Sequence, residues 1–202
     1  RWKADKVKEK NMKSLNEKIT EEFPKEKLIL GHGNLNSPII LIGEAPGAKE
    51  IELGEPFVGQ AGKYFDEFLQ VLKINREDIY ITNTVKYRPT KSNPKTKRLS
   101  NRTPTLKEVD SFRDYLYEEI HIIDPRIIVT LGNTPLKAIF NEDLKIGKVH
   151  GSLMEKDIKD NIYKIFPLYH PAAVIYRREL KEVYMSDLVG LREKIKKLLK
   201  NH

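Results

Sequence analysis

Residues 38–62 read PIILIGEAPGAKEIELGEPFVGQAG, and this stretch decides the fold class. It begins with an uninterrupted apolar run, residues 39–42, which predicts a buried strand. A turn of small residues and a loop with one aromatic, Phe57, come next, and Gly62 opens an amphipathic stretch that predicts a helix over residues 62–72. Open α/β sheets bind ligands where strands end in this way, because main-chain amides meet negative charge there.

The rest of the chain alternates between short apolar runs and amphipathic stretches. Further strands are predicted over residues 79–82, 126–131 and 163–168. Helices are predicted over residues 5–22, 105–123 (with a Thr105–Glu108 capping box), 135–140 and 178–199. Residues 148–154 are expected in an edge hairpin or a loop. This order predicts a three-layer α/β/α fold with a central four-stranded parallel sheet.

Composition limits the class of protein. The 202 residues, 39% hydrophobic and 33% charged, predict a single domain over residues 1–202, with residues 1–25 as an N-terminal helical extension. No apolar run is long enough to span a membrane and the first residues lack a secretory core, so we expect a cytoplasmic protein. The chain has no cysteine, which excludes disulfides and thiolate metal sites, and its five histidines lack metal-type spacing.

The positive charge points to a polyanionic partner. The formal net charge is +8, which by itself is also typical of a soluble, lysine-rich surface. The charge is concentrated in a segment rich in Pro, Ser, Thr and Asn, which predicts a basic loop and not a helix face. Its cations are Lys86, Arg88, Lys91, Lys95, Lys97, Arg98 and Arg102.

Polar residues follow three of the predicted strands. They are Glu44 after the first strand, Asn83 after the second and His170 after the fourth, and Phe57 lies in the first loop. Parallel strands end at one edge, so these groups are expected to line one crevice in which an amide reads a planar base edge, a ring stacks on it and an imidazole stabilises an anion. Each also has a structural interpretation: Asn83 as a turn former, His170 as a structural histidine, Phe57 as part of the core, and Glu44 as a helix cap or the partner of a lysine.

Four segments resemble the uracil-DNA glycosylase superfamily, specifically its family 4 branch. GEAPG with GEPFVGQAG, ITNTVKYRPT, RTPTLKEV and LYHPAAVI occur in the order found in that family, so the resemblance spans about residues 38–200. It implies a four-stranded parallel sheet flanked by helices. It also implies hydrolysis of the N-glycosidic bond between uracil and deoxyribose in DNA, on a base that is flipped out of the helix.

The resemblance also implies a role for each matching residue. Glu44, Asn83 and His170 would be catalytic: Glu44 beside the attacking water, Asn83 on the polar edge of uracil, and His170 on O2 of the leaving base. Phe57 would stack on the base, and Glu50 would exclude the thymine methyl. Main-chain amides around Ala45 and Gly59 would complete the pocket.

The expected partner is uracil-containing DNA, single- or double-stranded, bound by a monomer. Phosphate contacts are assigned to Arg88, Lys91, Lys95, Lys97 and Arg98. Residues after His170 resemble the minor-groove wedge of the family, with Ile175, Tyr176 and Arg177 against DNA. The alternative for Ile175 and Tyr176 is a buried loop anchor.

Two features depart from the family pattern. Typical members hold a [4Fe–4S] cluster on four cysteines, whereas here the first pair is missing, Tyr87 stands at the third position and Phe112 at the fourth. We therefore expect no cofactor, with aromatic packing in place of the cluster. Ala45 occupies a position where other branches place a water-activating residue. The rival interpretation is a catalytically weakened homologue that binds uracil or damaged DNA. A nucleotide hydrolase is disfavoured, because no GxxxxGK[ST] loop is present.

Overall fold

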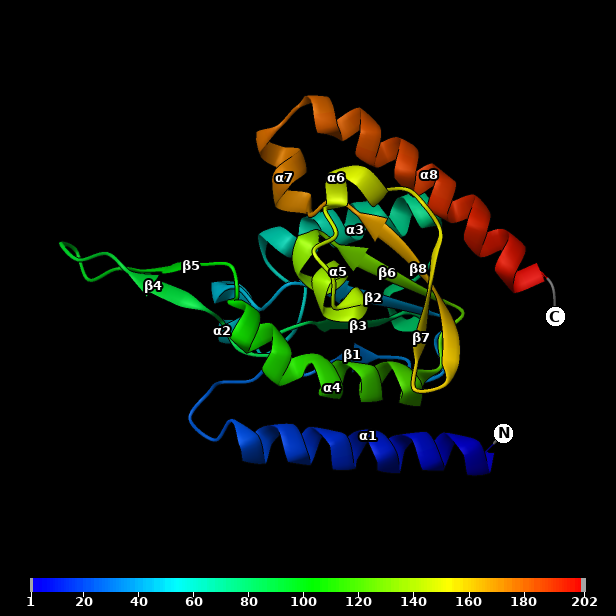
Figure 1. The fold of residues 1–202 in the computed structure, drawn as a ribbon, viewed down its shortest axis with the longest axis horizontal. Helices are drawn as coiled ribbons and strands as arrows, with labels where there is room; N and C mark the ends of the chain where they lie inside the picture. The colour runs from blue at the N-terminus through cyan, green and yellow to red at the C-terminus, as the bar shows by residue number, and fades with distance from the viewer. Residues whose placement is uncertain (1, 201–202) are drawn as a thin grey trace.

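A mixed β-sheet forms the centre of the computed structural model, which describes residues 2–200 (Figure 1). Within these residues the sheet has six strands in the order β1-β3-β2-β6-β8-β7. The four central strands are parallel, as predicted: β3 (Tyr80–Asn83), β2 (Ile39–Gly43), β6 (Ile127–Leu131) and β8 (Asn161–Leu168). Gly43 pairs with Asn83 at the ends of β2 and β3, so two sequence motifs meet at the edge of the sheet.

Two antiparallel edge strands correct the prediction of a four-stranded sheet. They are β1 (His32–Gly33), which pairs with β3, and β7 (Met154–Ile158), which pairs with β8. The expected extended stretch 148–154 begins instead in a short helix, α6 (Ile146–Val149). β7 gave little apolar signal because its exposed face carries charged side chains, and its backbone hydrogen bonds come from pairing with β8.

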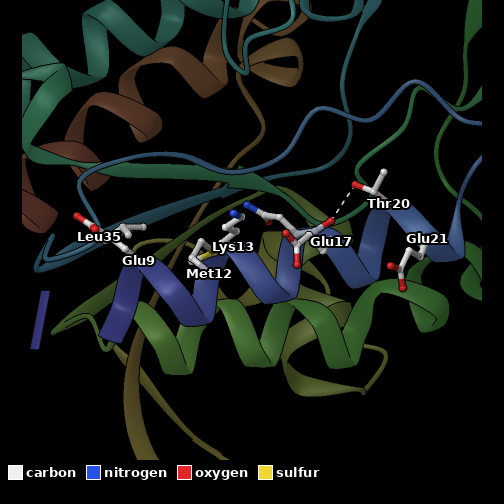
Figure 2. A pocket seen from close by; sticks show the side chains of 8 residues that line it. Glu9, Met12, Lys13, Glu17, Thr20, Glu21 and Leu35 are labelled. Carbon is white, nitrogen blue, oxygen red and sulfur yellow. Dashed lines mark hydrogen bonds between the residues drawn. The ribbon is translucent and has the colours of Figure 1, made fainter. Parts of the chain in front are cut away.

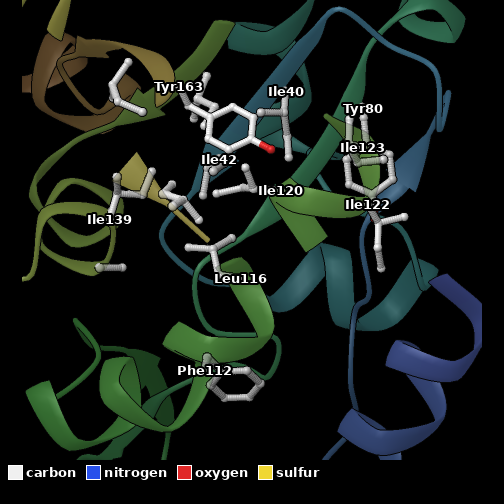
Figure 3. Close-up of a cluster of buried hydrophobic side chains, with 14 of the residues drawn as sticks. Ile40, Ile42, Tyr80, Phe112, Leu116, Ile120, Ile122, Ile123, Ile139 and Tyr163 are labelled. Atoms are coloured by element: carbon white, nitrogen blue, oxygen red, sulfur yellow. The ribbon is translucent and has the colours of Figure 1, made fainter. Parts of the chain in front are cut away.

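Helices cover both faces of the sheet, because successive strand residues point to opposite sides. Ile40 and Ile42 pack with α1 (Trp2–Glu22), α4 (Leu106–Ile123) and α5 (Asn133–Phe140), in the core that Figure 3 shows. Ile39 and Leu41 pack with α3 (Gln60–Leu72) and α8 (Glu179–Lys200). None of these helices, as described over residues 2–200, has the length and apolar character needed to cross a membrane.

Several elements near the strand ends were not predicted. The basic segment, expected as a loop, is a hairpin of β4 (Thr90–Ser92) and β5 (Leu99–Asn101) that projects from the body (Figure 1). Its strands are short, exposed and polar, so no apolar alternation marked them. The helices α2 (Ala48–Leu53) and α7 (Pro171–Tyr176) and the 3₁₀ turn η1 (Arg76–Asp78) are too short to leave a periodic pattern.

Candidate functional site

A cavity of about 380 Å³ opens where β2, β3 and β8 end. Its volume falls within the range of about 300–1,000 Å³ that is typical of small-molecule sites. Four chain segments that are distant in sequence contribute to its wall. Of the predicted pocket residues, Glu44, Ala45, Glu50, Phe57, Asn83 and His170 line it. Gly59 is the exception: its neighbours Val58 and Gln60 line the cavity, while Gly59 precedes α3 with a positive φ of 66°.

Gly43 allows two site side chains to approach each other closely. A Cβ atom added at Gly43 would lie 2.4 Å from Asn83 Oδ1 and 2.8 Å from Phe57 Cζ. Both distances are shorter than real Cβ atoms tolerate. The missing side chain at this strand end therefore lets the amide of Asn83 and the ring of Phe57 come together above β2.

Phe57 belongs both to the core and to the cavity wall. Its ring is 8% exposed and lies 5.6 Å from the ring of Phe65. Its φ of 54° is rare for a side chain of this size and is held from outside the loop. Arg76 donates from Nη2 to the Pro56 carbonyl (2.9 Å) and from Nη1 to the Phe57 carbonyl (3.4 Å). Sequence reasoning missed Arg76, because nothing near it in the chain marks this contact.

His170 is held as a neutral hydrogen-bond donor. It caps α7, and its Nδ1 accepts the main-chain N–H of Ala172 at 3.1 Å, which assigns the proton of the neutral ring to Nε2. Burial lowers the pKa of His170, and the nearby charge of Glu44 only partly opposes this. Gly132, with a φ of 81°, lets the chain pass close to the ring, since a Cβ there would lie 3.0 Å from His170 Cβ. The structural role as a cap thus coexists with a place in the cavity wall.

Two carboxylates in the wall lie in different environments. Glu44 is half-buried, and its Oε2 accepts a hydrogen bond from Thr134 Oγ1 at 2.6 Å. Glu50 is 7% exposed, and its Oε2 accepts the main-chain N–H of Gly47 at 3.0 Å at the start of α2. Burial raises the pKa of Glu50, while the main-chain hydrogen bonds oppose the shift. Thr134, at the start of α5, is a further residue that the sequence did not single out.

The predicted DNA-contacting residues lie on or next to the hairpin and α7, and both of these elements contribute residues to the cavity wall. Four cations of the hairpin are exposed, namely Lys91, Lys95, Lys97 and Arg98. Arg88 is half-buried and donates from Nε to Asn101 Oδ1 at 2.6 Å. The exposed residues of α7, Ile175 (41%) and Tyr176 (86%), line the cavity together with the hairpin base, and Arg177 is exposed beside them. Tyr176 is therefore not a buried loop anchor, and α7 and the hairpin extend from the same end of the molecule (Figure 1).

Three aromatic rings pack at the base of the hairpin. Phe23 and Phe112 stack with centroids 4.5 Å apart, and Tyr87 meets Phe112 edge-on at 5.6 Å. Tyr87 Oη donates to Glu108 Oε1 at 2.8 Å, and Arg102 holds the same carboxylate with bonds of 2.7 and 2.9 Å. Chiefly because of Arg102, the pKa of Glu108 falls to about 2. Sequence reasoning missed Phe23 and the pairing of Arg102.

Two other findings bear on binding. Among residues 2–200, no group of three or more His, Asp or Glu side chains is arranged to hold a metal ion. A separate hollow of about 650 Å³ runs along α1 (Figure 2). Charged and polar side chains of α1 dominate its lining, and it shares no residue with the cavity at the strand ends.

Comparison with known proteins identifies the family. The family model for the uracil DNA glycosylase superfamily matches residues 30–189. The chain belongs to this superfamily. The match includes all four motifs quoted above, so the resemblance read from them is confirmed.

Relatives of known name indicate the branch of the superfamily that this chain resembles. A type-4 uracil-DNA glycosylase of Archaeoglobus fulgidus is 40% identical over 84% of this chain and 82% of its own length. The enzyme of the same name from Sulfurisphaera tokodaii is 36% identical over 81% of this chain and 72% of its own. That from Thermotoga maritima is 36% identical over 84% of each chain.

Proposed function

We propose that this protein is a uracil-DNA glycosylase that hydrolyses the N-glycosidic bond of uracil in DNA and leaves an abasic site. One observation carries the proposal: Glu44 and Phe57 of the first motif, Asn83 of the second and His170 of the last line a single cavity of base-binding size. The type-4 glycosylases that the chain resembles over most of its length supply the substrate class.

The base is recognised by its face and its edge. The ring of Phe57 stacks on uracil, and the amide of Asn83 reads its polar edge, because an amide donates and accepts at once. The closeness of both groups above Gly43 supports this pairing. Glu50 accepts the main-chain N–H of Gly47 at the start of α2, which fixes its carboxylate in the cavity wall. Its proposed role is to exclude a methyl group at C5 of the base.

The leaving group is a uracil anion, and His170 stabilises it. As the bond from N1 to the sugar breaks, negative charge spreads to O2, where the Nε2–H of the neutral imidazole donates. Oxyanion donors of this kind contribute ~2–4 kcal/mol to the transition state. Water adds its oxygen to the sugar carbon and its proton is released. Glu44, held by Thr134, lies beside that water and stabilises the cationic sugar.

The DNA backbone is held at the mouth of the cavity. Lys91, Lys95, Lys97 and Arg98 of the hairpin contact phosphates, and Arg88 stiffens the hairpin base through Asn101. Ile175 or Tyr176 of α7 fills the space vacated by the flipped base, because apolar side chains inserted into a base stack stabilise the distorted duplex.

The aromatic cluster of Phe23, Tyr87 and Phe112 takes the structural place of an iron–sulfur cluster. A [4Fe–4S] group needs cysteine thiolates, and the chain has none, so its residues do not fit that cofactor. The packed rings and the Glu108–Arg102 pair connect the hairpin base to α4 instead. Iron analysis and the visible spectrum of purified protein test this, and a bound cluster would refute it.

A cleavage assay tests the activity. Wild type is expected to cut an oligonucleotide with one uracil after alkali treatment, whereas H170A and N83A lose most cleavage and still bind the DNA. If H170A and N83A both cleave at the wild-type rate, the assigned site is wrong. Binding of uracil DNA without turnover by wild type would favour the rival, a weakened homologue. A single domain, a monomeric state, action on single- or double-stranded DNA and a cytoplasmic location stay predictions.

A further inference from the structure

A buried ion pair lies directly behind Asn83. Lys86 and Glu119 of α4 have side chains 1% and 2% exposed, and Nζ of Lys86 lies 2.6 Å from Glu119 Oε2. Lys86 also donates to Thr82 Oγ1 at 2.6 Å and to the main-chain carbonyl of Asn83 at 2.8 Å. The three protons of the ammonium group therefore have three acceptors, and one of them is the backbone of a proposed base-reading residue.

The carboxylate of Glu119 is equally well satisfied. Tyr80 Oη donates to Oε1 at 2.7 Å, and Thr82 Oγ1 donates to Oε2 at 3.2 Å. Burial, and then the charge of Glu119, raise the pKa of Tyr80 well above its usual value, so the phenol stays a donor. The network thus joins α4 to the inner residues of β3 without an unpaired polar group among its members.

Such a pair is a poor device for stability alone. Desolvation of two charges offsets much of their attraction, and well-packed apolar residues of similar volume often stabilise as much or more. A satisfied buried network does, however, specify one arrangement of the chain. Here the network fixes the main-chain conformation of residues 83–86, where the chain leaves β3 beside the cavity.

The same segment is held from its other side by the first motif. Thr84 N–H donates to the Gly43 carbonyl at 2.9 Å, and Val85 N–H donates to the Glu44 carbonyl at 3.0 Å. The Lys86 bond to the Asn83 carbonyl completes a short stretch whose main chain is held at every step. A rotation of the peptide at Asn83 would move its side-chain amide relative to Phe57 and to a bound base.

We propose that Lys86 and Glu119 are positioning residues that set the orientation of the Asn83 amide for base recognition and bond cleavage. The inference rests on the proposed role of Asn83. Although Lys86 lies in the basic segment of the sequence, its burial removes it from the DNA surface. Loss of the pair therefore lowers the rate of chemistry and leaves DNA affinity nearly unchanged.

The test is a thermodynamic cycle on single-turnover excision. The variants are K86M/E119M, N83A and the combination of all three, each with its melting temperature and its affinity for abasic product DNA. We expect K86M/E119M to remain folded and to lose about 10- to 100-fold in excision rate, because small misplacements of a reacting group cost that much. We expect the triple variant to be no slower than N83A, since both changes act through one side chain.

A matched control uses a more exposed ion pair, which joins Glu118, the residue before Glu119 on α4, to Lys159 in the turn between β7 and β8. K159M/E118M makes the same chemical exchange at the surface and is expected to keep the wild-type rate. If K86M/E119M does not fold, T82V removes one acceptor of Lys86 at nearly constant volume. It is expected to slow excision several-fold, with affinity for product DNA unchanged.

The failures are distinguishable. A folded K86M/E119M or T82V variant with the wild-type excision rate would overturn the positioning role. The role would also be overturned if the triple variant were slower than N83A by the full factor that K86M/E119M loses on its own. Full activity of N83A would instead overturn the assignment of Asn83 itself.

Discussion

Adding one methyl group at Gly43 tests the geometry of the site most directly. Gly43 lies in β2 with an ordinary strand conformation, so alanine is allowed by the backbone, and the atoms nearest to its Cβ belong to Asn83 and Phe57. The new Cβ would lie 2.4 Å from Asn83 Oδ1, whereas ordinary contact begins at 3.4 Å. The amide must therefore move by about 1 Å, and a displacement of that size costs ~100-fold in rate, or ~2.7 kcal/mol.

The stability cost of G43A is separate from its effect on rate. Pressure on the Phe57 ring, 2.8 Å from the added carbon, destabilises the fold by ~1–3 kcal/mol, as overpacking does. Single-turnover cleavage of a uracil oligonucleotide, with melting temperature and product-DNA affinity in parallel, resolves the two effects.

Gly190 supplies the control. It lies on an exposed face of α8 with nothing within 4 Å of an added Cβ, so G190A is expected to stabilise the helix by ~1 kcal/mol and to keep the wild-type rate. A folded G43A that excises uracil at the wild-type rate would refute the view that Asn83 and Phe57 hold the base above Gly43.

Three further predictions address charge. Burial lowers the pKa of His170, and protonation of Nδ1 would break the hydrogen bond that it accepts from Ala172 and so disturb the ring. The loss of wild-type rate at acid pH should therefore lie below the usual value of 6.5 and be absent from the pH profile of H170N; a loss above 6.5 would contradict this. The pKa of Glu108 is lowered from 4.5 to about 2, so its ion pair with Arg102 stabilises the fold fully above pH 4.5 and less as the pH falls toward 2. In urea unfolding, E108Q should therefore lower the free energy of unfolding more at pH 7 than at pH 3.5. An equal loss at both pH values would refute the pairing. K97A/R98A should weaken binding to all DNA sequences and reduce the slope of log affinity against log salt by about 2, and an unchanged slope would exclude these residues from phosphate contact.

The central sheet was predictable because its strands are buried on both faces. A continuous apolar run such as residues 39–42 must be buried on both faces, which is typical of a central parallel strand. The flanking helices are predicted by the periodic spacing of their own apolar residues. The edge strand β7 escaped prediction for the opposite reason. It is a short strand whose five residues include only two apolar side chains, and its stability comes from pairing with β8 across a two-residue turn.

The same distinction separates the site residues that sequence reasoning found from those it missed. Glu44 follows β2, Asn83 is the last residue of β3 and His170 lies two residues after β8, so the topology of a parallel sheet brings them to one edge whatever the details of packing. Arg76 acts through a hydrogen bond to the carbonyl of Phe57, 19 residues earlier, and no pattern announces such a contact.

Lys86 shows where charge as a sequence signal fails. In composition it is one more cation in a basic segment, and a surface role is the natural expectation. In the fold its ammonium group is enclosed by Thr82, Asn83 and Glu119 at hydrogen-bonding distance. A cation is rarely buried without such a set of partners, and here the partners are assembled by β3 and α4 together. A lysine that the sequence groups with the cations of the basic segment is thus buried between β3 and α4, behind the proposed base pocket. If it positions Asn83, its variants will lower the rate of excision and leave DNA affinity nearly unchanged.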